Sequence, residues 1–515
     1  MSLRPQRPGR MRARAGRAQH AVACLSGVCA ALLLACALLA ARRRPALDDP
    51  AALLADPALR AAVVERMIAS TPSGFDSHPD PDVGYVLLAG EGTRQTLGHA
   101  VDASALGLRE RSYALPKPPG TLRVVLLGDS YVFGWGVEAG ERLGSVLEAE
   151  LRERAPAFEG EIECLHLAVP SWNAAAECAF ALRQLEALRP DLLVQVTVEN
   201  DLDDNAGVRG FGAMSTDSPA HRDRADGRIH SGAPRALGAP ASNLLAFGLD
   251  HESRSRLDEA ARWFARLSSA VEEQGGRYLL VGNWDVLNGV LSRELEGRLP
   301  ASRLVFLPAA FVEDQALRVS REDRHWSAAG HRELARMLLG HALAQGLVPA
   351  LGLPPDPDLE REAASFFEAG RTDAERGARQ GLDLAEGLLT ELDFTTVDPA
   401  EAAQVHGGVD GEGRAAPYAS LLLRRGAGTR LVVEGENISS LVLRGASVQV
   451  FADELALGEL ALGTPEPLVL DAALPPEVLA RPFVSIRFVS TDYTYVGEDL
   501  RHCVAFRLKR VALVP

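Results

Sequence analysis

The chain has 515 residues, which is more than one ordinary domain needs and enough for two or three. Its composition, with 47% hydrophobic and 24% charged residues, is typical of a globular protein. The formal net charge of −15 argues against nucleic acid as a partner, and no Cys-x-x-Cys or His-Glu-x-x-His motif indicates a metal centre.

The N-terminal region contains an uncharged run, residues 21–41, that is rich in alanine and leucine and long enough to span a membrane. Three arginines, residues 42–44, follow at once and disfavour cleavage of the run as a signal peptide. The sequence ending at Cys36 loosely resembles a lipoprotein processing site, but apolar residues continue after it. Six arginines precede the run, so we expect residues 1–20 to be a basic cytoplasmic tail and the rest of the chain to lie outside the cytoplasmic membrane, in the periplasm or beyond the cell.

Residues 42–115 form an N-terminal extension to the next unit. The sequence Tyr85-Val86-Leu87-Leu88 predicts a small edge strand or hairpin there. The cluster Lys117-Pro118-Pro119-Gly120 breaks regular structure, and we expect a domain of residues 116–350 to begin beside it.

Apolar runs alternate with amphipathic stretches throughout residues 116–350. This alternation predicts an α/β domain with a parallel sheet covered by helices on both faces. Residues 201–242 show no periodicity and are either a lid or a disordered segment. Cys164 and Cys178 are predicted to be buried free thiols, with a bridge between them as the alternative. The predicted strands are 124–127, 161–167, 191–198, 278–281 and 303–307, and the predicted helices are 142–153, 173–188, 253–273, 285–295 and 327–343.

Two regions with different sequence patterns follow the predicted α/β domain. Residues 351–392 are charged and alanine-rich, which predicts a helical connector. Short strands with turn residues between them then predict an all-β sandwich of residues 393–515. The strands expected there are 420–423, 430–433, 440–443, 447–452, 467–470, 483–489 and 503–508.

Four short motifs stand where the α/β domain would carry its chemistry. They are Gly-Asp-Ser at 128–130, a segment at 167–173 that contains Ser171, Val-Glu-Asn-Asp at 198–201, and Asp-Arg-His-Trp at 323–326. Three follow predicted strands and the fourth precedes the last helix, so all four should meet at one edge of a parallel sheet. In this order the motifs resemble those of the SGNH, or GDSL-type, serine hydrolases across roughly residues 116 to 348, and imply the three-layer, flavodoxin-like fold of that family.

The resemblance implies a catalytic triad. Ser130 is the nucleophile, and His325 is the base that takes its proton. A carboxylate should hold the imidazole in one tautomer. The common family spacing Asp-x-x-His would select the position of Glu322, whereas the spacing Asp-x-His-Trp, found in other members, selects Asp323, which we favour.

The resemblance also implies an oxyanion hole. Its donors are the backbone N–H groups of Ser130 and Ser171 and the side chain of Asn200. Two positions depart from the family pattern, because Ser171 and Val198 stand where glycines are usual. No cofactor and no metal is implied.

The function expected from these features is that of a membrane-anchored, extracytoplasmic serine esterase. The C-terminal sandwich resembles jelly-roll modules that accompany carbohydrate-active enzymes, and Trp135, Trp172 and Trp326 lie beside the motifs. O-acyl groups on a cell-surface polysaccharide are therefore one expected substrate, beside lipid or aryl esters. Two alternatives stay open: a polysaccharide O-acyltransferase that uses the same triad, and a non-catalytic glycan-binding scaffold.

Overall fold

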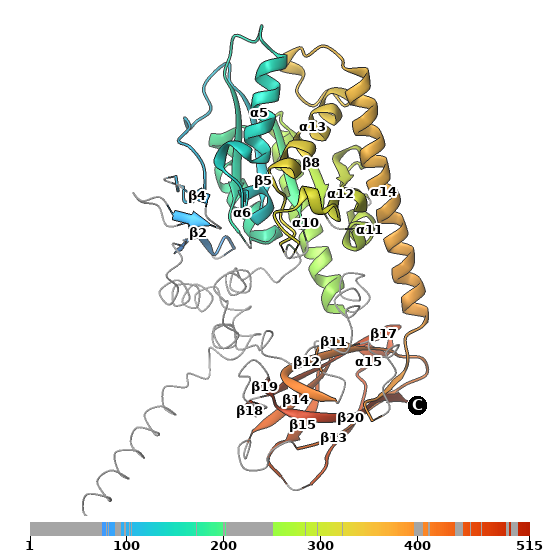
Figure 1. The fold of residues 1–515 in the computed structure, drawn as a ribbon. Coiled ribbons are helices and arrows are strands. Elements are labelled where there is room, and N and C mark those ends of the chain that lie inside the picture. Colours follow the sequence, from blue (N-terminus) through green and yellow to red (C-terminus); the bar gives the residue numbers. More distant parts are fainter. Residues whose placement is uncertain are drawn as a thin grey trace, which may run out of the picture.

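The structure is a computed structural model (Figure 1). It describes residues 75–515 except 79, 81, 88–93, 97–98, 102, 105, 171, 199–200, 202–250, 284, 296, 322, 396–404, 410–412, 438–445, 454, 465, 491–493 and 496–502. The predicted tail and membrane helix, most of the predicted lid, Ser171, Asn200, Glu322 and the predicted strand 440–443 lie outside the described residues. Among the residues described, no helix is both long and apolar enough to span a membrane.

A five-stranded parallel sheet forms the centre of the α/β domain, as predicted. Its order is β6-β5-β7-β8-β9, and every neighbouring pair is parallel. All seven residues of β5 are buried, because a central parallel strand is covered on both faces. The strands are β5 (Leu122–Gly128), β6 (Ile162–Ala168), β7 (Leu192–Thr197), β8 (Arg277–Gly282) and β9 (Leu304–Phe306).

Helices connect these strands and cover the sheet (Figure 1). The first and last of them, α5 and α13, contact each other, and α6 contacts α10. Their bounds are within three residues of those predicted: α5 (Leu143–Arg154), α6 (Ala174–Leu188), α10 (His251–Glu273), α11 (Asp285–Leu295) and α13 (Ala328–Ala344). Shorter helices are α4 (Ser130–Phe133), α12 (Ala309–Val312), η2 (Ala139–Glu141), η4 (Ala301–Arg303), η5 (Gln315–Leu317) and η6 (Pro349–Leu351). Cys164 and Cys178 are free and buried, so the alternative bridge does not form.

The strand order reverses direction at a defined point of the sheet. From β5 the chain first moves to β6 on one side and then continues through β7 on the other. Ligand sites of open α/β sheets lie outside the carboxyl ends of the strands at such a reversal. Ser130 follows β5, and Asp201 follows β7, so both stand at this edge.

Short hairpins precede the α/β domain. Strand β1 (Phe75–Ser77) pairs with β2 (Tyr85–Leu87), and β3 (Arg94–Thr96) pairs with β4 (His99–Val101), which agrees with the hairpin expected near Tyr85. Val83, Tyr85, Leu87 and Leu108 are buried in the same hydrophobic core as the parallel sheet. Packing of the α/β unit therefore involves residues well before the breaker cluster at 117–120.

The predicted connector is the helix α14 (Pro357–Glu386). It contacts α13, α11 and β9, and Leu359, Ala363 and Phe367 are buried in the α/β core. After it, β10 (Glu391–Asp393) already pairs with the C-terminal strand β20, so the β region begins slightly earlier than residue 393.

The C-terminal region is all-β, as expected. Nine strands form one antiparallel sheet, in the order β15-β14-β17-β12-β20-β13-β16, with β10 paired to β20 and β11 to β12. The end strands β15 and β16 contact each other, so the sheet curls around its core. The strands are β11 (Val405–Val409), β12 (Arg414–Arg424), β13 (Arg430–Glu436), β14 (Ser447–Ala452), β15 (Leu455–Ala461), β16 (Leu468–Ala473), β17 (Phe483–Ser490) and β20 (Phe506–Val514), beside the short pair β18 (Thr494–Tyr495) and β19 (Cys503–Val504) and the helix α15 (Pro476–Leu479).

Candidate active site

Ser130 lies at a sharp turn between a strand and a helix. Strand β5 ends at Gly128, and α4 begins at Ser130. A side chain at position 128 would overlap with that of Val132, so the turn requires glycine there. Asp129 caps the helix by accepting a hydrogen bond from the backbone N–H of Tyr131 at 3.0 Å. The turn thus presents the Ser130 hydroxyl at the edge of the sheet.

A chain of hydrogen bonds joins Ser130, His325 and Asp323. His325 Nε2 lies 2.8 Å from Ser130 Oγ, and His325 Nδ1 lies 2.5 Å from Asp323 Oδ1. The imidazole and carboxylate side chains are each 25% exposed, so a substrate can reach them from solvent. The structure therefore brings together the serine, the histidine and the favoured carboxylate of the sequence prediction, while Glu322 lies outside the described residues.

The protons in the hydrogen bonds among Ser130, His325 and Asp323 have a consistent arrangement. The hydrogen bond from His325, which exceeds the opposing effect of partial burial, lowers the pKa of Asp323, so this carboxyl is charged. A charged carboxylate accepts the Nδ1–H, which leaves Nε2 free to accept the proton of the Ser130 hydroxyl. Ser130 Oγ also lies 3.2 Å from Asp129 Oδ2, but the histidine nitrogen is the nearer acceptor.

The loop before α13 orients His325 through local hydrogen bonds. Asp323 Oδ1 also accepts the backbone N–H of His325 at 3.0 Å, which closes a turn across one residue. The His325 carbonyl accepts the N–H of Val319 at 2.8 Å, and the hydroxyl of Ser320 accepts the N–H of Asp323 at 3.1 Å. Short polar side chains stabilise this turn, and this explains why the acid two residues before the histidine can reach its ring.

Aromatic rings surround the imidazole. The ring of Tyr131 lies 4.8 Å from that of His325, and the ring of Trp135 lies 5.9 Å away, both centre to centre. Trp172 and Trp326 are buried in the core, at 0% and 2% exposed. Of the three tryptophans near the motifs, only Trp135 is partly exposed at the site.

The second and third motifs lie beside the first, although their predicted oxyanion donors Ser171 and Asn200 are outside the described residues. Asn173 caps α6 by accepting the N–H of Ala176 at 3.0 Å. Asp201 Oδ2 accepts the N–H of Val198 at 2.7 Å, and the Asp201 N–H donates back to the Val198 carbonyl at 3.2 Å. The third motif is therefore a tight turn closed by Asp201, and the roles of Ser171 and Asn200 stay predictions.

Three buried acids, Asp129, Glu177 and Asp201, lie beneath the site, and the sequence reasoning missed the last two. Glu177 is 0% exposed and accepts a hydrogen bond from Gln195 at 2.7 Å. Gln195 in turn accepts one from the hydroxyl of Tyr278 at 2.7 Å. A glutamate within the apolar start of α6 and the aspartate that ends the third motif are the sequence signals that could have indicated these buried acids.

One of these acids carries a proton. Glu177 Oε1 and Asp201 Oδ1 are both buried acceptors without a donor, and a proton on one carboxyl supplies the missing donor. Burial, reinforced by the charge of Asp201, raises the pKa of Glu177 well above its ordinary value. We assign the proton to Glu177, which then donates to Asp201, the acid that closes the third-motif turn.

The whole arrangement can perform nucleophilic catalysis. The serine hydroxyl forms a hydrogen bond with one histidine nitrogen, and a carboxylate forms a hydrogen bond with the other. This is the arrangement that activates the serine of acyl-transfer enzymes. Within the described part of the chain, no group of three or more His, Cys, Asp or Glu side chains is arranged to hold a metal ion.

Comparison with known proteins gives only distant likenesses. No protein-family model and no curated protein matches the sequence. Among solved structures, the lipase Lip_vut3 from a goat rumen metagenome is 15% identical, with a TM-score of 0.27, over 43% of this chain and 97% of that one. TesA is 16% identical, with a TM-score of 0.27, over 44% of this chain and 99% of that one.

A two-domain esterase (CEX) active on acetylated mannans is 11% identical, with a TM-score of 0.25, over 76% of this chain and 90% of that one. Two of these three proteins are a lipase and an esterase by their printed names. TM-scores this low do not establish a shared fold, so the class of this protein rests on its own strand order, motif order and site geometry.

The proton on Glu177 makes stability depend on pH. A carboxyl whose pKa is raised on folding stabilises the protein fully below its ordinary pKa near 4.5, and this contribution is lost as pH rises through the raised value. Glu177→Gln mimics the protonated acid without titrating. We expect the variant to gain stability relative to wild type above pH 4.5, by up to about 1.4 kcal/mol per pH unit.

Urea unfolding of both proteins between pH 4.5 and 8 measures this difference. Glu186→Gln, an exposed change on the same helix, is the matched control and should show a difference from wild type that does not vary with pH. A constant difference for Glu177→Gln as well would contradict the assignment of the proton.

Proposed function

We propose that this protein is a serine esterase that forms an acyl-enzyme on Ser130. The observation that carries the proposal is the chain of hydrogen bonds from Asp323 through His325 to Ser130 at the carboxyl edge of the parallel sheet. The side chains come from loops 195 residues apart in the sequence, and their order along the chain is that of the SGNH motifs.

The first half of the reaction acylates the serine. Ser130 Oγ attacks the carbonyl carbon of the ester while its proton moves to His325 Nε2. Asp323 stabilises the imidazolium that results. The C–O bond to the leaving alkoxide then breaks, and His325 returns the proton to that oxygen, so that an alcohol departs.

The second half repeats these steps with water. His325 takes a proton from a water molecule as its oxygen attacks the acyl carbon, and then returns a proton to Ser130 Oγ as the acid leaves. In both halves a negative oxygen develops on the acyl carbon. The donors proposed for it are the backbone N–H groups of Ser130 and Ser171 and the side chain of Asn200.

The substrate that we propose is an O-acyl group on a cell-surface polysaccharide. Trp135 is partly exposed beside His325, and a tryptophan face can stack on a sugar ring. The C-terminal β region, proposed as a jelly-roll-like module, would provide a second contact with such a polymer. Lipid and aryl esters would use the same triad.

We propose that the enzyme is anchored in the cytoplasmic membrane by residues 21–41, with the α/β domain outside. The support is the uncharged run itself and the excess of arginines before it. This location would bring the site to polymers of the cell surface.

Replacing the nucleophile tests the proposal directly. Ser130→Ala should abolish hydrolysis of p-nitrophenyl acetate and labelling by a fluorophosphonate, because no oxygen remains to form the covalent bond. Ser145→Ala, an equally half-buried serine on α5, should retain both properties. Substantial turnover by Ser130→Ala would contradict the proposal. If the wild-type protein forms an acylated sugar when an oligosaccharide acceptor is added, the reaction is acyl transfer in place of hydrolysis.

Replacing the carboxylate tests the assignment of Asp323. Asp323→Asn should lower kcat by about 10⁴, because an amide favours the wrong imidazole tautomer. Glu322→Gln should change kcat little, and it is the matched control because it removes a neighbouring charge. If Glu322→Gln proves the more damaging change, the spacing Asp-x-x-His is the right template for this chain.

Reporter fusions test the membrane location. A reporter active only in the periplasm, fused after residue 115, should be active, and a reporter active only in the cytoplasm should be silent at the same point. The opposite pattern would overturn the proposed orientation.

A further inference from the structure

Tyr85 forms hydrogen bonds with Pro170 and Trp172, the two neighbours of position 171. Its hydroxyl donates a hydrogen bond to the carbonyl of Pro170 at 2.9 Å, and its own carbonyl accepts one from the indole N–H of Trp172 at 2.8 Å. Tyr85 and Trp172 are each 0% exposed. One residue of the N-terminal hairpin thus holds the second motif on either side of the residue predicted to supply an oxyanion donor.

The position of Tyr85 is itself well determined. Strand β2 pairs with β1, the N–H of Leu87 donates to the carbonyl of Gly107 at 2.8 Å, and Val83 and Leu108 are buried around it. Burial, reinforced by the negative charge of Asp129, raises the pKa of Tyr85 well above its ordinary value. The hydroxyl therefore keeps its proton and remains a donor throughout the working pH range.

Arg109, from the same N-terminal segment, holds the turn that follows the nucleophile. Its buried guanidinium donates to the carbonyls of Phe133, Gly134 and Val137, at 3.3, 2.6 and 2.8 Å. Gly134 ends α4 with a positive φ of 78°, so this turn is the C-terminal cap of the helix that begins at Ser130. Arg109 therefore supports the short helix that carries the nucleophile.

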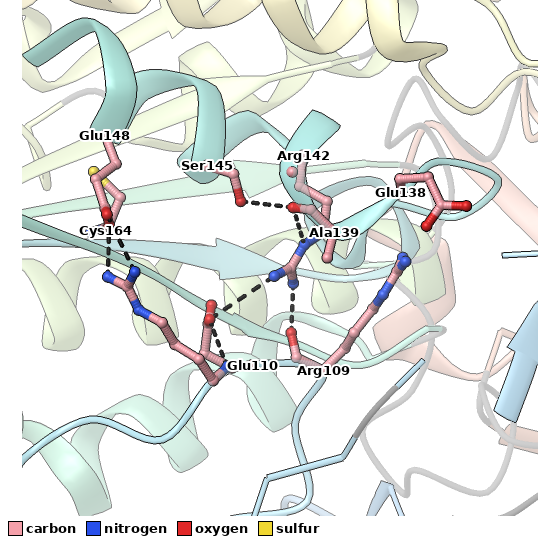
Figure 2. Close-up of a pocket in the computed structure, with 10 residues that line it drawn as sticks. Arg109, Glu110, Glu138, Ala139, Arg142, Ser145, Glu148 and Cys164 are labelled. Atoms are coloured by element: carbon pink, nitrogen blue, oxygen red, sulfur yellow. Dashed lines mark hydrogen bonds and ion pairs between the residues drawn. The ribbon is translucent and has the colours of Figure 1, made fainter. Parts of the chain in front are cut away.

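A buried ionic cluster fixes Arg109 in turn (Figure 2). The guanidinium of Arg142 donates to the Arg109 carbonyl and lies 3.8 Å from the carboxylate of Glu110. Glu110 also accepts the Nδ1–H of His166 at 2.7 Å and its backbone N–H at 2.8 Å. Although burial raises it, these contacts bring the pKa of Glu110 down to about 2, so the acid stays charged and the cluster stays paired.

Oxyanion stabilisation is sensitive to such support. A donor is effective only when it lies 2.7–3.1 Å from the oxygen of the tetrahedral intermediate, so a small shift of the loop that carries it weakens the bond. The usual glycine of the second motif is Ser171 here, and Tyr85 holds the Pro170 carbonyl before it and the Trp172 indole after it from outside the α/β sheet.

We propose that Tyr85 and Arg109, which precede the parallel sheet, support the catalytic site and that Tyr85 is a positioning residue for the oxyanion hole. It would act by holding the Pro170 carbonyl and the Trp172 side chain, which flank the residue proposed to supply a backbone donor, while Arg109 supports the helix of the nucleophile. The inference rests on the proposed esterase activity. It assigns a catalytic purpose to a segment that precedes the parallel sheet.

Tyr85→Phe tests this role, because it removes the hydroxyl and keeps the ring. With p-nitrophenyl acetate as substrate, kcat should fall about tenfold, which is less than the 10²–10³ lost with a whole oxyanion donor. KM and the acidic limb of the pH–rate profile should not change, because the bonds among Ser130, His325 and Asp323 remain. A trifluoromethyl ketone that forms a tetrahedral adduct should bind more weakly by the same factor as kcat/KM.

Tyr113→Phe is the matched control. Tyr113 also precedes the parallel sheet and is half-buried, and its hydroxyl makes no hydrogen bond to a described residue, so its loss should leave kcat unchanged. All rates are expressed per fluorophosphonate-reactive site, which corrects for any fraction of Tyr85→Phe that does not fold.

The outcomes separate the two proposals. Wild-type protein that neither turns over esters nor labels would refute the esterase itself. If the wild type is active and Tyr85→Phe keeps its kcat and its affinity for the ketone, or loses only thermal stability, Tyr85 has a structural role alone and the inference is wrong.

Discussion

The hydrogen bond between Ser130 and His325 is the contact on which the site depends, and it joins residues 195 positions apart. It can form only if the turn after β5 and the loop before α13 meet at one edge of the sheet. The strand order β6-β5-β7-β8-β9 provides this, because the strands are parallel and the loops at their carboxyl ends lie at one edge of the sheet. The fold thereby brings two side chains that are distant in the sequence within the hydrogen-bond distance that proton transfer requires.

Polar groups buried beneath this contact all need partners. Asp129 uses its carboxylate to cap α4, and Glu177 and Asp201 share a proton behind the third motif. Farther along the sheet edge, Glu110 meets His166 and Arg142. Since an unpaired buried charge is costly, each of these networks restricts the loop to which it is attached. The buried polar groups thus tie the described parts of the catalytic loops to the α/β core.

Residues that precede the parallel sheet also restrain the catalytic loops through hydrogen bonds. A domain defined by its strands alone would begin near residue 116, yet Tyr85 and Arg109 bond to backbone carbonyls beside the motifs. Backbone carbonyls in loops need donors once they are covered, and a segment that crosses the edge of the sheet can supply them. The helix α14 packs on the α/β core, and the curled β sheet that follows it has a hydrophobic core of its own.

The sequence by itself determined the alternation of strands and helices and the all-β C-terminal region, and it predicted Ser130 and His325 as site residues. Periodicity and short-range motifs are local properties, so they can be seen without contacts. It left Asp323 and Glu322 as rivals, and only the folded turn at 323–325 brought the Asp323 carboxylate to the ring. The hydrogen bonds of Tyr85, Arg109 and Glu177 were decided by tertiary structure alone, because their partners lie 18 to 87 residues away in the sequence and no local pattern encodes such pairings.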